Sequence, residues 1–303
     1  MSFGNIMPSE SNKFALRHKV RVGLIGADIQ MSKSPALHMR EASLHGLDYS
    51  YELIDLTLRG VAVDHLPDLL SEVEDRGFAG VNITHPCKQI VLPLLTRLAD
   101  DARSLGAVNT VVFHDGERVG HNTDCSGFYE NFRQGLPDVT RDRALLLGAG
   151  GAGAAVAHAA LSLGMGHLLI SDQDASRAES LARSLNEQFA PGRASATGDI
   201  EAAMQAADGL IHATPTGMRN HPGLPLDGAL IESRHWVADI VYMPLVTPLL
   251  ALARDRGCRT LDGGGMVVYQ AAGALRLFAG IEPDAARMRR HFSELVGADA
   301  APA

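Results

Sequence analysis

A glycine-rich segment near the middle of the chain constrains the possible fold more than any other feature. Gly148, Gly150 and Gly153 follow the apolar run Arg143–Leu147 and precede a stretch of small residues, so the pattern G-x-G-x-x-G stands between a strand signal and a helix signal. The first glycine permits a tight turn, the second lets backbone approach a pyrophosphate, and the third lets the helix pack closely on the strand. The pattern predicts a dinucleotide site. The alternative is a turn that only packs the helix against the sheet.

Asp172 indicates which dinucleotide this site would take. It ends the next apolar run, at the distance where a carboxylate accepts hydrogen bonds from the adenosine ribose. A carboxylate there also repels a 2′-phosphate, so Asp172 favours NAD, with NADP as the weaker alternative. Arg177 complicates this, because a guanidinium can bind the extra phosphate or instead cover the adenine or the diphosphate. Asp172 could also be the N-cap of the following helix, a role that Asp174 fits equally well.

Strand and helix signals alternate along the chain, which predicts an α/β fold with mostly parallel sheets. Ser34-Pro35 predicts a helix start with Ser34 as the N-cap, and Asp115-Gly116 predicts the turn of a hairpin. The predicted strands are 20–25, 49–56, 80–84, 107–113, 118–121, 143–147, 167–171, 209–212, 236–241 and 259–261. The predicted helices are 36–45, 65–76, 89–99, 153–163, 175–189, 266–278 and 283–295.

The length predicts two domains, because 303 residues are about twice a typical domain of about 150. Residues 1–121 together with 267–303 are expected to form a mostly parallel α/β domain that binds substrate. Residues 122–266 are expected to form a Rossmann domain that binds the dinucleotide. We expect the active site in the cleft between the two domains.

Charge and cysteine content exclude several classes of function. The chain has 27 Lys and Arg against 35 Asp and Glu, a net charge of −8 without a basic run, so neither nucleic acid nor a membrane surface is expected as a partner. Residues 144–171 lack charged side chains, but their glycines fit strand, turn and helix better than a membrane span. The 3 cysteines are far apart and predict no disulfide framework, which favours a reducing, cytoplasmic location. The 13 histidines show no metal-ligand spacing, so no metal is expected. A monomer and a homodimer both stay open.

Polar residues with different reach stand at the ends of the predicted strands in the amino-terminal half. Ligands bind at strand ends of such sheets, so these residues could line one cleft. A cleft of hydroxyls, amides, one Lys and one Asp suits a polyhydroxylated small molecule, because each buried donor needs a partner. The residues are Ser32, Lys33, Ser34, Asn82, Thr84, His85, Lys88, Asn109, Thr110, Asn122, Thr123 and Asp124.

From about Val22 to Leu295 the sequence resembles the shikimate dehydrogenase family, and within it the NAD-using quinate/shikimate dehydrogenases. Eight motifs carry the resemblance in order, which is far more specific than any single one. They are Ser32-Lys-Ser-Pro35, Asn82-Ile-Thr-His-Pro-Cys-Lys88, Gly106-Ala-Val-Asn-Thr110, Asn122-Thr-Asp124, Gly148 to Gly153, Ala213-Thr-Pro-Thr-Gly-Met218, Asp239-Ile-Val-Tyr-Met-Pro244 and Asp262-Gly-Gly-Gly-Met266 with Gln270.

The resemblance implies an oxidoreductase of aromatic amino acid biosynthesis that uses Lys88 and Asp124 as its catalytic pair. It implies that the substrate is held by Ser32, Ser34, Thr84, Asn109 and Gln270, with Tyr242 nearby. It implies that the cofactor lies along Gly148, Ala149, Gly150, Gly151, Ala152, Gly153, Thr214, Met218, Val241, Gly264 and Met266.

Two positions bear on specificity within the family. The NADP-using branch carries Asn-Arg-Thr where this chain has Ser171-Asp172-Gln173, and this departure supports NAD. A Thr in place of the second Ser of the Ser-x-Ser motif accompanies quinate preference in some relatives. Ser34 keeps the shikimate-like form, so the choice between shikimate and quinate stays open.

The chemistry requires hydride departure to the nicotinamide and removal of a hydroxyl proton. An ammonium Lys88 can stabilise the alkoxide, and a neutral Lys88 can take the proton; a nearby Asp124 favours the ammonium. We therefore expect a coupled pair that shares proton transfer. The structural alternatives are an exposed Lys88, Asp124 as a plain N-cap, and Tyr242 and Cys87 as packing residues. The functional alternatives are a dehydrogenase of a related ring alcohol such as aminoshikimate, and a non-catalytic regulator that binds NAD or shikimate.

Overall fold

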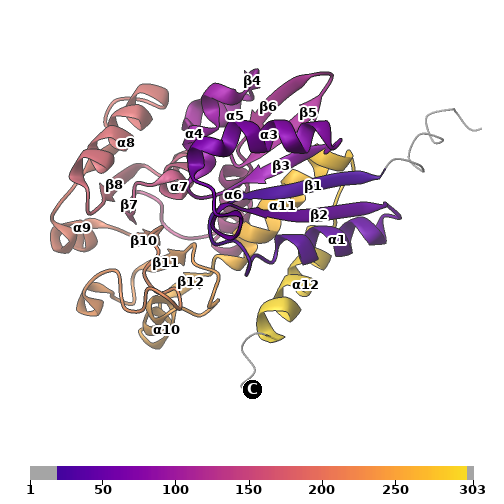
Figure 1. Cartoon of the computed structure of the whole chain (residues 1–303). Coiled ribbons are helices and arrows are strands. Elements are labelled where there is room, and N and C mark those ends of the chain that lie inside the picture. The colour runs from indigo at the N-terminus through magenta and orange to yellow at the C-terminus, as the bar shows by residue number, and fades with distance from the viewer. Residues whose placement is uncertain (1–18, 299–303) are drawn as a thin grey trace, which may run out of the picture.

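Two six-stranded sheets organise residues 19–298, the part of the chain that this computed structural model describes (Figure 1). The first sheet has the order β2-β1-β3-β5-β6-β4 and the second has the order β12-β11-β10-β7-β8-β9. This confirms the predicted fold class, α/β with a Rossmann-type second sheet. The outer ends of the expected substrate domain, residues 1–18 and 299–303, lie outside the described residues.

The first sheet is mixed. β1 pairs in parallel with β2 and β3, and β4 pairs in parallel with β6. The predicted hairpin supplies the antiparallel pairs of β5 with β3 and β6, and its turn residues Asp115 and Gly116 both have positive φ, 50° and 76°. The strands are β1 Val20–Gly26, β2 Tyr49–Asp55, β3 Gly80–Ile83, β4 Arg97–Leu98, β5 Thr110–His114 and β6 Glu117–His121.

The second sheet is parallel throughout the pairs that join its strands. β7 lies between β8 and β10, so the chain reverses its direction of sheet growth next to the glycine-rich turn. Such a switch point leaves a crevice at the carboxyl ends of the strands, where ligands bind. The strands are β7 Arg143–Leu147, β8 His167–Ser171, β9 Ala194–Ala196, β10 Gly209–His212, β11 Trp236–Asp239 and β12 Arg259–Leu261.

Helices α6 and α11 pack against each other and connect the two halves of the molecule. Phe128 and Phe132 of α6 are buried in the core of the second sheet beside Trp236. The carboxyl-terminal helices α11 and α12 instead contact α1, so the end of the chain returns to the first sheet (Figure 1). The helices are α1 Ser34–Leu44, α2 Leu56–Arg59, α3 Leu66–Asp75, α4 Cys87–Ile90, α5 Asp100–Leu105, α6 Thr123–Gly135, α7 Gly151–Ser162, α8 Ala175–Gln188, α9 Ile200–Ala206, α10 Pro248–Asp255, α11 Gly264–Ala279 and α12 Ala285–Ala298, with 3-10 turns at Val63–His65, Leu92–Leu94 and Gly228–Leu230. No helix in the described range combines the length and the apolar character needed to cross a membrane.

Two local predictions are wrong. The expected helix over 89–99 ends early: α4 stops at Ile90, a 3-10 turn containing Pro93 follows, and β4 then pairs with β6. Proline has no N–H to continue a helix, and the backbone that follows pairs with the sheet instead. Ser34 is not the N-cap of α1, because the helix already begins at Ser34. The N-cap is Lys33, which makes no side-chain capping hydrogen bond, and the Oγ of Ser32 before it accepts the Ser34 N–H at 3.3 Å.

Candidate active site

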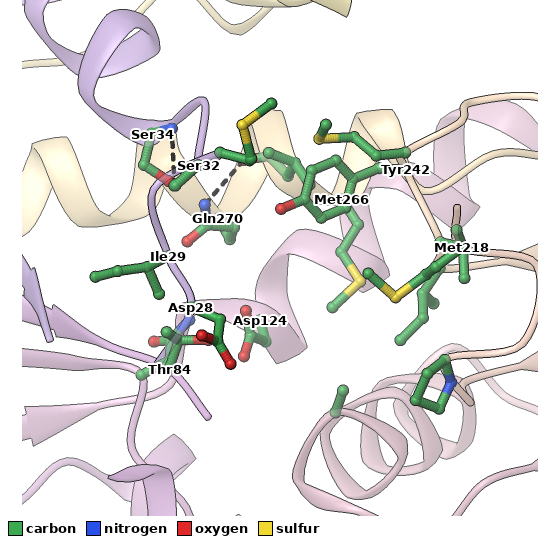
Figure 2. A pocket seen from close by; sticks show the side chains of 18 of the residues that line it. Asp28, Ile29, Ser32, Ser34, Thr84, Asp124, Met218, Tyr242, Met266 and Gln270 are labelled. Atoms are coloured by element: carbon green, nitrogen blue, oxygen red, sulfur yellow. Dashed lines mark hydrogen bonds between the residues drawn. The ribbon is translucent and has the colours of Figure 1, made fainter. Parts of the chain in front are cut away.

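A cavity of about 660 Å³ opens between the two sheets, with walls from both halves of the chain. Figure 2 shows polar side chains such as Ser32 and Thr84 on the side of the first sheet, and Met218 on the side of the second. Every residue expected to bind substrate or to act in catalysis lines this cavity. These residues are Ser32, Ser34, Thr84, Lys88, Asn109, Asp124, Tyr242 and Gln270.

Lys88 and Asp124 form an ion pair in the cavity wall. Lys88 Nζ lies 2.5 Å from Asp124 Oδ2, and the two side chains are only 21% and 12% exposed. Lys88 belongs to α4, directly after β3, and Asp124 belongs to the first turn of α6. The N-cap of α6 is Asn122, whose Oδ1 accepts from the N–H groups of Asp124 and Cys125. Lys88 is therefore not an exposed surface residue, and Asp124 is not the N-cap, so both structural alternatives are wrong.

A buried hydrogen-bond network fixes the end of α6 that carries Asp124. Asn109 Nδ2 donates to Thr123 Oγ1 at 3.0 Å, and the Thr123 N–H donates to Asn109 Oδ1 at 2.8 Å. Asn82 extends the network, because its amide donates to Thr110 Oγ1 and accepts from the Tyr51 hydroxyl. Asn109 thus supports Asp124 and also reaches the cavity, whereas Asn82 lies behind the cavity wall.

The side chains around the substrate end of the cavity differ in how they are held. The Gln270 amide donates to the Val267 carbonyl at 3.1 Å, as the dashed line in Figure 2 marks. Burial, followed by the charge of Asp124, raises the pKa of Tyr242. The Tyr242 ring also lies 6.1 Å from the ring of Phe292, so it packs and lines the cavity at once.

Cys87 is fully buried, and burial raises the pKa of its thiol to about 11, which agrees with its interpretation as a packing residue.

The glycine turn has the geometry of a phosphate cradle. Gly148 has a φ of 102°, and a Cβ on Gly153 would lie only 2.1 Å from the Gly148 carbonyl oxygen, so both positions require glycine. A Cβ on Gly150 would meet nothing within 4 Å, and one on Gly151 would meet only Lys88 Cδ at 3.9 Å. The backbone is therefore open on the side that faces Lys88.

The first turn of α7 has no side-chain cap, a feature that it shares with α1, α3, α4, α5 and α11. Its first N–H groups need an acceptor from elsewhere, and a phosphate supplies one while complementing the helix dipole. The residues of this turn therefore fit a dinucleotide diphosphate.

Asp172 is tied to the glycine turn. Its Oδ2 accepts from the Ala149 N–H at 2.7 Å, and its Oδ1 accepts from the Asp174 N–H at 2.9 Å. Asp174 is the N-cap of α8, which excludes that role for Asp172. Arg177 is 65% exposed, and its Nε lies 3.5 Å from Asp174 Oδ2.

The residues expected along the cofactor fall into two groups. Ala152, Thr214, Met218, Val241 and Met266 line the cavity. Gly264 does not, because it begins α11 in a packed position against Leu245 and Phe292. The remaining candidates also lie outside the cavity wall and belong to the turn and its flank; they are Gly148, Ala149, Gly150, Gly151, Gly153, Asp172 and Arg177.

The sequence analysis missed several residues of the cavity wall. They lie in the loops that follow β1, β10 and β11, where the rule that ligands bind at strand ends could have found them. Asp28 gave no signal of its own, although it has a φ of 56°, which non-glycine residues rarely adopt. The missed residues include Ala27, Asp28, Ile29, Met31, Pro215, Arg219, Asn220, Ile240 and Met243.

The chain is similar to known proteins over most of its length. Residues 24–111 match the family described as the shikimate dehydrogenase substrate binding domain. A protein of Streptomyces avermitilis named shikimate dehydrogenase (NADP(+)) is 54% identical over 278 residues, covering 91% of this chain and 96% of that protein. A protein of Corynebacterium efficiens named quinate/shikimate dehydrogenase (NAD(+)) is 46% identical over 281 residues, covering 91% and 98%.

The fold is also shared with a solved structure, quinate dehydrogenase from Corynebacterium glutamicum in complex with NAD. The two chains superpose with a TM-score of 0.86 at 43% identity, covering 91% of this chain and 99% of that one. Both the amino-acid sequence and the arrangement of the two sheets are thus similar over nearly the whole length. The chain belongs to the shikimate dehydrogenase family of oxidoreductases.

Proposed function

We propose that this protein transfers hydride between NAD and the ring carbinol of shikimate or quinate, with 3-dehydroshikimate or 3-dehydroquinate as the ketone form. The ion pair of Lys88 and Asp124 in the cavity wall, 2.5 Å apart, carries the proposal. In this account residues 1–121 and 267–303 bind the substrate, and residues 122–266 bind the cofactor. The hydroxyls and amides of Ser32, Ser34, Thr84, Asn109 and Gln270 hold the substrate's hydroxyls and carboxylate.

Lys88 and Asp124 handle the proton. When bound, the nicotinamide supplies the hydride acceptor at its C4 atom. During oxidation the carbinol proton passes to the Lys88–Asp124 pair as the hydride leaves, and during reduction the Lys88 ammonium returns a proton to the ketone oxygen. The 2.5 Å distance between Lys88 Nζ and Asp124 Oδ2 lets a proton pass between the two groups, so they can act on the carbinol proton together. The partial burial of both side chains strengthens their interaction compared with bulk water.

The charges near the glycine turn support NAD over NADP. Asp172 accepts from the Ala149 N–H at 2.7 Å, which holds its carboxylate beside the turn where the ribose would lie. A 2′-phosphate there would meet the Asp172 carboxylate, and Arg177 is paired with Asp174. One similar relative is named for NADP(+) and another for NAD(+), so the proposed preference for NAD rests on these local charges.

The experiment is to follow the absorbance of the reduced nicotinamide with each of the four pairs of shikimate or quinate with NAD or NADP. We expect turnover with NAD and at least one of the two acids, and a lower kcat/KM with NADP. Binding of NAD without turnover of any pair would favour the regulator. Turnover confined to another ring alcohol, such as aminoshikimate, would favour the related dehydrogenase.

A further inference from the structure

A buried His–Asp pair joins the ends of two neighbouring strands beneath the cofactor side of the cavity. His212 ends β10 and Asp239 ends β11, and the two side chains are 0% exposed. His212 Nδ1 lies 2.9 Å from Asp239 Oδ1, and His212 Nε2 lies 2.5 Å from Thr214 Oγ1. Neither His212 nor Asp239 lines the cavity, and the proton transfer by Lys88 and Asp124 does not use them.

Asp239 is held by two further hydrogen bonds besides that of His212. The Thr247 hydroxyl donates to Asp239 Oδ2 at 2.7 Å, and the Val241 N–H donates to Asp239 Oδ1 at 2.9 Å. Thr247 is in turn the N-cap of α10. The carboxylate therefore has little freedom to move. Its hydrogen bond to His212 Nδ1 in turn restricts the orientation of the imidazole ring.

With Asp239 as a carboxylate and His212 as a neutral ring, the donors and acceptors along this chain follow from the atoms that face each other. A carboxylate only accepts, so His212 Nδ1 carries the hydrogen that points to Asp239. In the neutral ring Nε2 is then an acceptor, and the Thr214 hydroxyl donates its hydrogen to it. Thr214 Oγ1 also accepts from the Thr216 N–H at 3.3 Å. What Thr214 can still offer to a ligand is an oxygen lone pair, that is, an acceptor.

Thr214 connects this network to the glycine turn. A Cβ built on Gly148 would lie 3.1 Å from Thr214 Cγ2 and 2.6 Å from the Ala213 carbonyl oxygen, so the segment after β10 packs directly on the turn. Thr214 also lines the cavity. Any movement of Thr214 would therefore change the shape of the region where the dinucleotide is expected to bind.

We propose that His212 is a positioning residue for the cofactor. Its two hydrogen bonds connect Asp239, which is held in place, to the Thr214 hydroxyl. The Thr214 oxygen is thereby fixed as an acceptor for an N–H or O–H donor of the bound dinucleotide. This inference rests on the proposed function. It requires no contact between His212 and the cofactor, because His212 acts through Thr214. The pair costs desolvation energy to bury, which its hydrogen bonds offset.

The test measures the Kd of NADH by fluorescence titration without substrate, and the KM of shikimate separately. We expect His212→Asn and Thr214→Val each to raise the Kd about tenfold. If His212 acts through Thr214, the double variant should bind no more weakly than either single variant. Thr214→Ser, which keeps the hydroxyl, should restore binding, and the KM of shikimate should stay within about twofold of wild type in all variants.

The matched control is His235→Asn. His235 is also buried and makes two hydrogen bonds, to the Glu232 N–H and the Met204 carbonyl, but it precedes β11 at the end away from the cavity. This variant should lose stability and keep the wild-type Kd.

The inference is overturned if His212→Asn leaves the Kd unchanged, or if His235→Asn weakens NADH binding equally. If His212→Asn does not fold, the comparison of Thr214→Val with Thr214→Ser decides, and equal affinity of those two variants would overturn the inference. Failure of the wild-type protein to bind either NADH or NADPH would instead refute the proposed function, and this inference with it.

Discussion

Asp172 carries the proposed choice of cofactor at the scale of a single residue. Its carboxylate accepts two backbone N–H groups, from Ala149 and Asp174, so it lies in a defined position beside the turn. The repulsion energy between two negative unit charges about 4 Å apart near a protein surface is about 4 kcal/mol. Only part of that is expected as discrimination, because the phosphate can shift and solvent screens it.

Asp172→Asn removes this charge and keeps one amide oxygen as an acceptor. We expect the ratio of kcat/KM with NADP to that with NAD to rise about tenfold or more, because the repulsion of the 2′-phosphate is lost. Initial rates with both cofactors and one substrate measure the ratio. An unchanged ratio would show that Asp172 does not face the ribose.

His38 makes the stability of the fold depend on pH. It is fully buried in α1, its Nδ1 lies 3.1 Å from the Tyr49 hydroxyl, and burial lowers the pKa of the ring to about 3. The unfolded chain binds a proton at His38 near pH 6.5, while the folded protein does not until about pH 3. Stability is therefore fully present above about pH 6.5 and is lost as the pH falls toward the folded-state pKa.

Urea unfolding of wild type and His38→Gln between about pH 7 and pH 5 checks this. The free energy of unfolding of wild type should fall on acidification, and that of His38→Gln should fall less, because glutamine takes up no proton. The difference between the two proteins removes the contribution of the other titrating groups. Parallel curves would mean that His38 does not contribute.

At the scale of elements, the strand–turn–helix unit β7–α7 contains one glycine that is needed for packing and another that is expected to matter only for ligand binding. Gly153 touches the Gly148 carbonyl and has no room for a side chain, whereas Gly150 faces open space. Gly150 also has a φ of −74°, which other residues adopt freely. The two glycines therefore serve different purposes within one turn.

Gly153→Ala should destabilise the protein by about 1–3 kcal/mol, because α7 must move away from β7 to admit the methyl group. Gly150→Ala should change stability by less than about 0.5 kcal/mol but raise the Kd of NADH at least about tenfold. Thermal unfolding and fluorescence titration of both variants provide the measurements. Wild-type NADH affinity in a folded Gly150→Ala protein would argue against a phosphate at this turn.

Helices and strands whose own residues show a clear sequence pattern were predicted well. Segments whose structure depends on hydrogen bonds to residues distant in the sequence were not. The glycine pattern identified β7 and α7 because each glycine meets a local steric demand. The predicted helix over 89–99 failed because backbone N–H groups at Thr96 and Ala99 bond to carbonyls of Arg118 and Gly120, a pairing that no local pattern announces. The short helices α5, α9 and α10 were also missed, since six to eight residues carry little periodicity.

At the scale of the whole molecule, the candidate site was predictable as a set of motifs but not as a network of contacts. Strand ends and the family resemblance selected Lys88 and Asp124, and the fold brings them together from positions 36 residues apart. The support of Asp124 by Asn109 and the link from Asp239 through His212 to Thr214 depend on the register of neighbouring strands, which the sequence does not state. Gly264, expected along the cofactor, does not line the cavity and instead packs against Leu245 and Phe292.

The two sheets contribute opposite walls of one cavity, and this division gives the proposed mechanism its geometry. Lys88 stands on the first wall, and a Cβ built on Gly151 of the glycine turn would lie 3.9 Å from Lys88 Cδ. A dinucleotide on the turn and a ring alcohol among the hydroxyls would then meet at the Lys88–Asp124 pair. Entry of both ligands would displace water from the cavity and so strengthen the charge interactions there.

The most direct test of this account is the turnover number of Lys88→Ala and Asp124→Asn with NAD and the better of the two acids, measured beside the Kd of NADH for each protein. The account predicts that kcat falls by about 10²–10⁴ in both variants, because the carbinol proton has lost its acceptor. It also predicts that the Kd of NADH changes by less than about threefold, which is under 1 kcal/mol. Near-normal kcat in either variant would contradict the account.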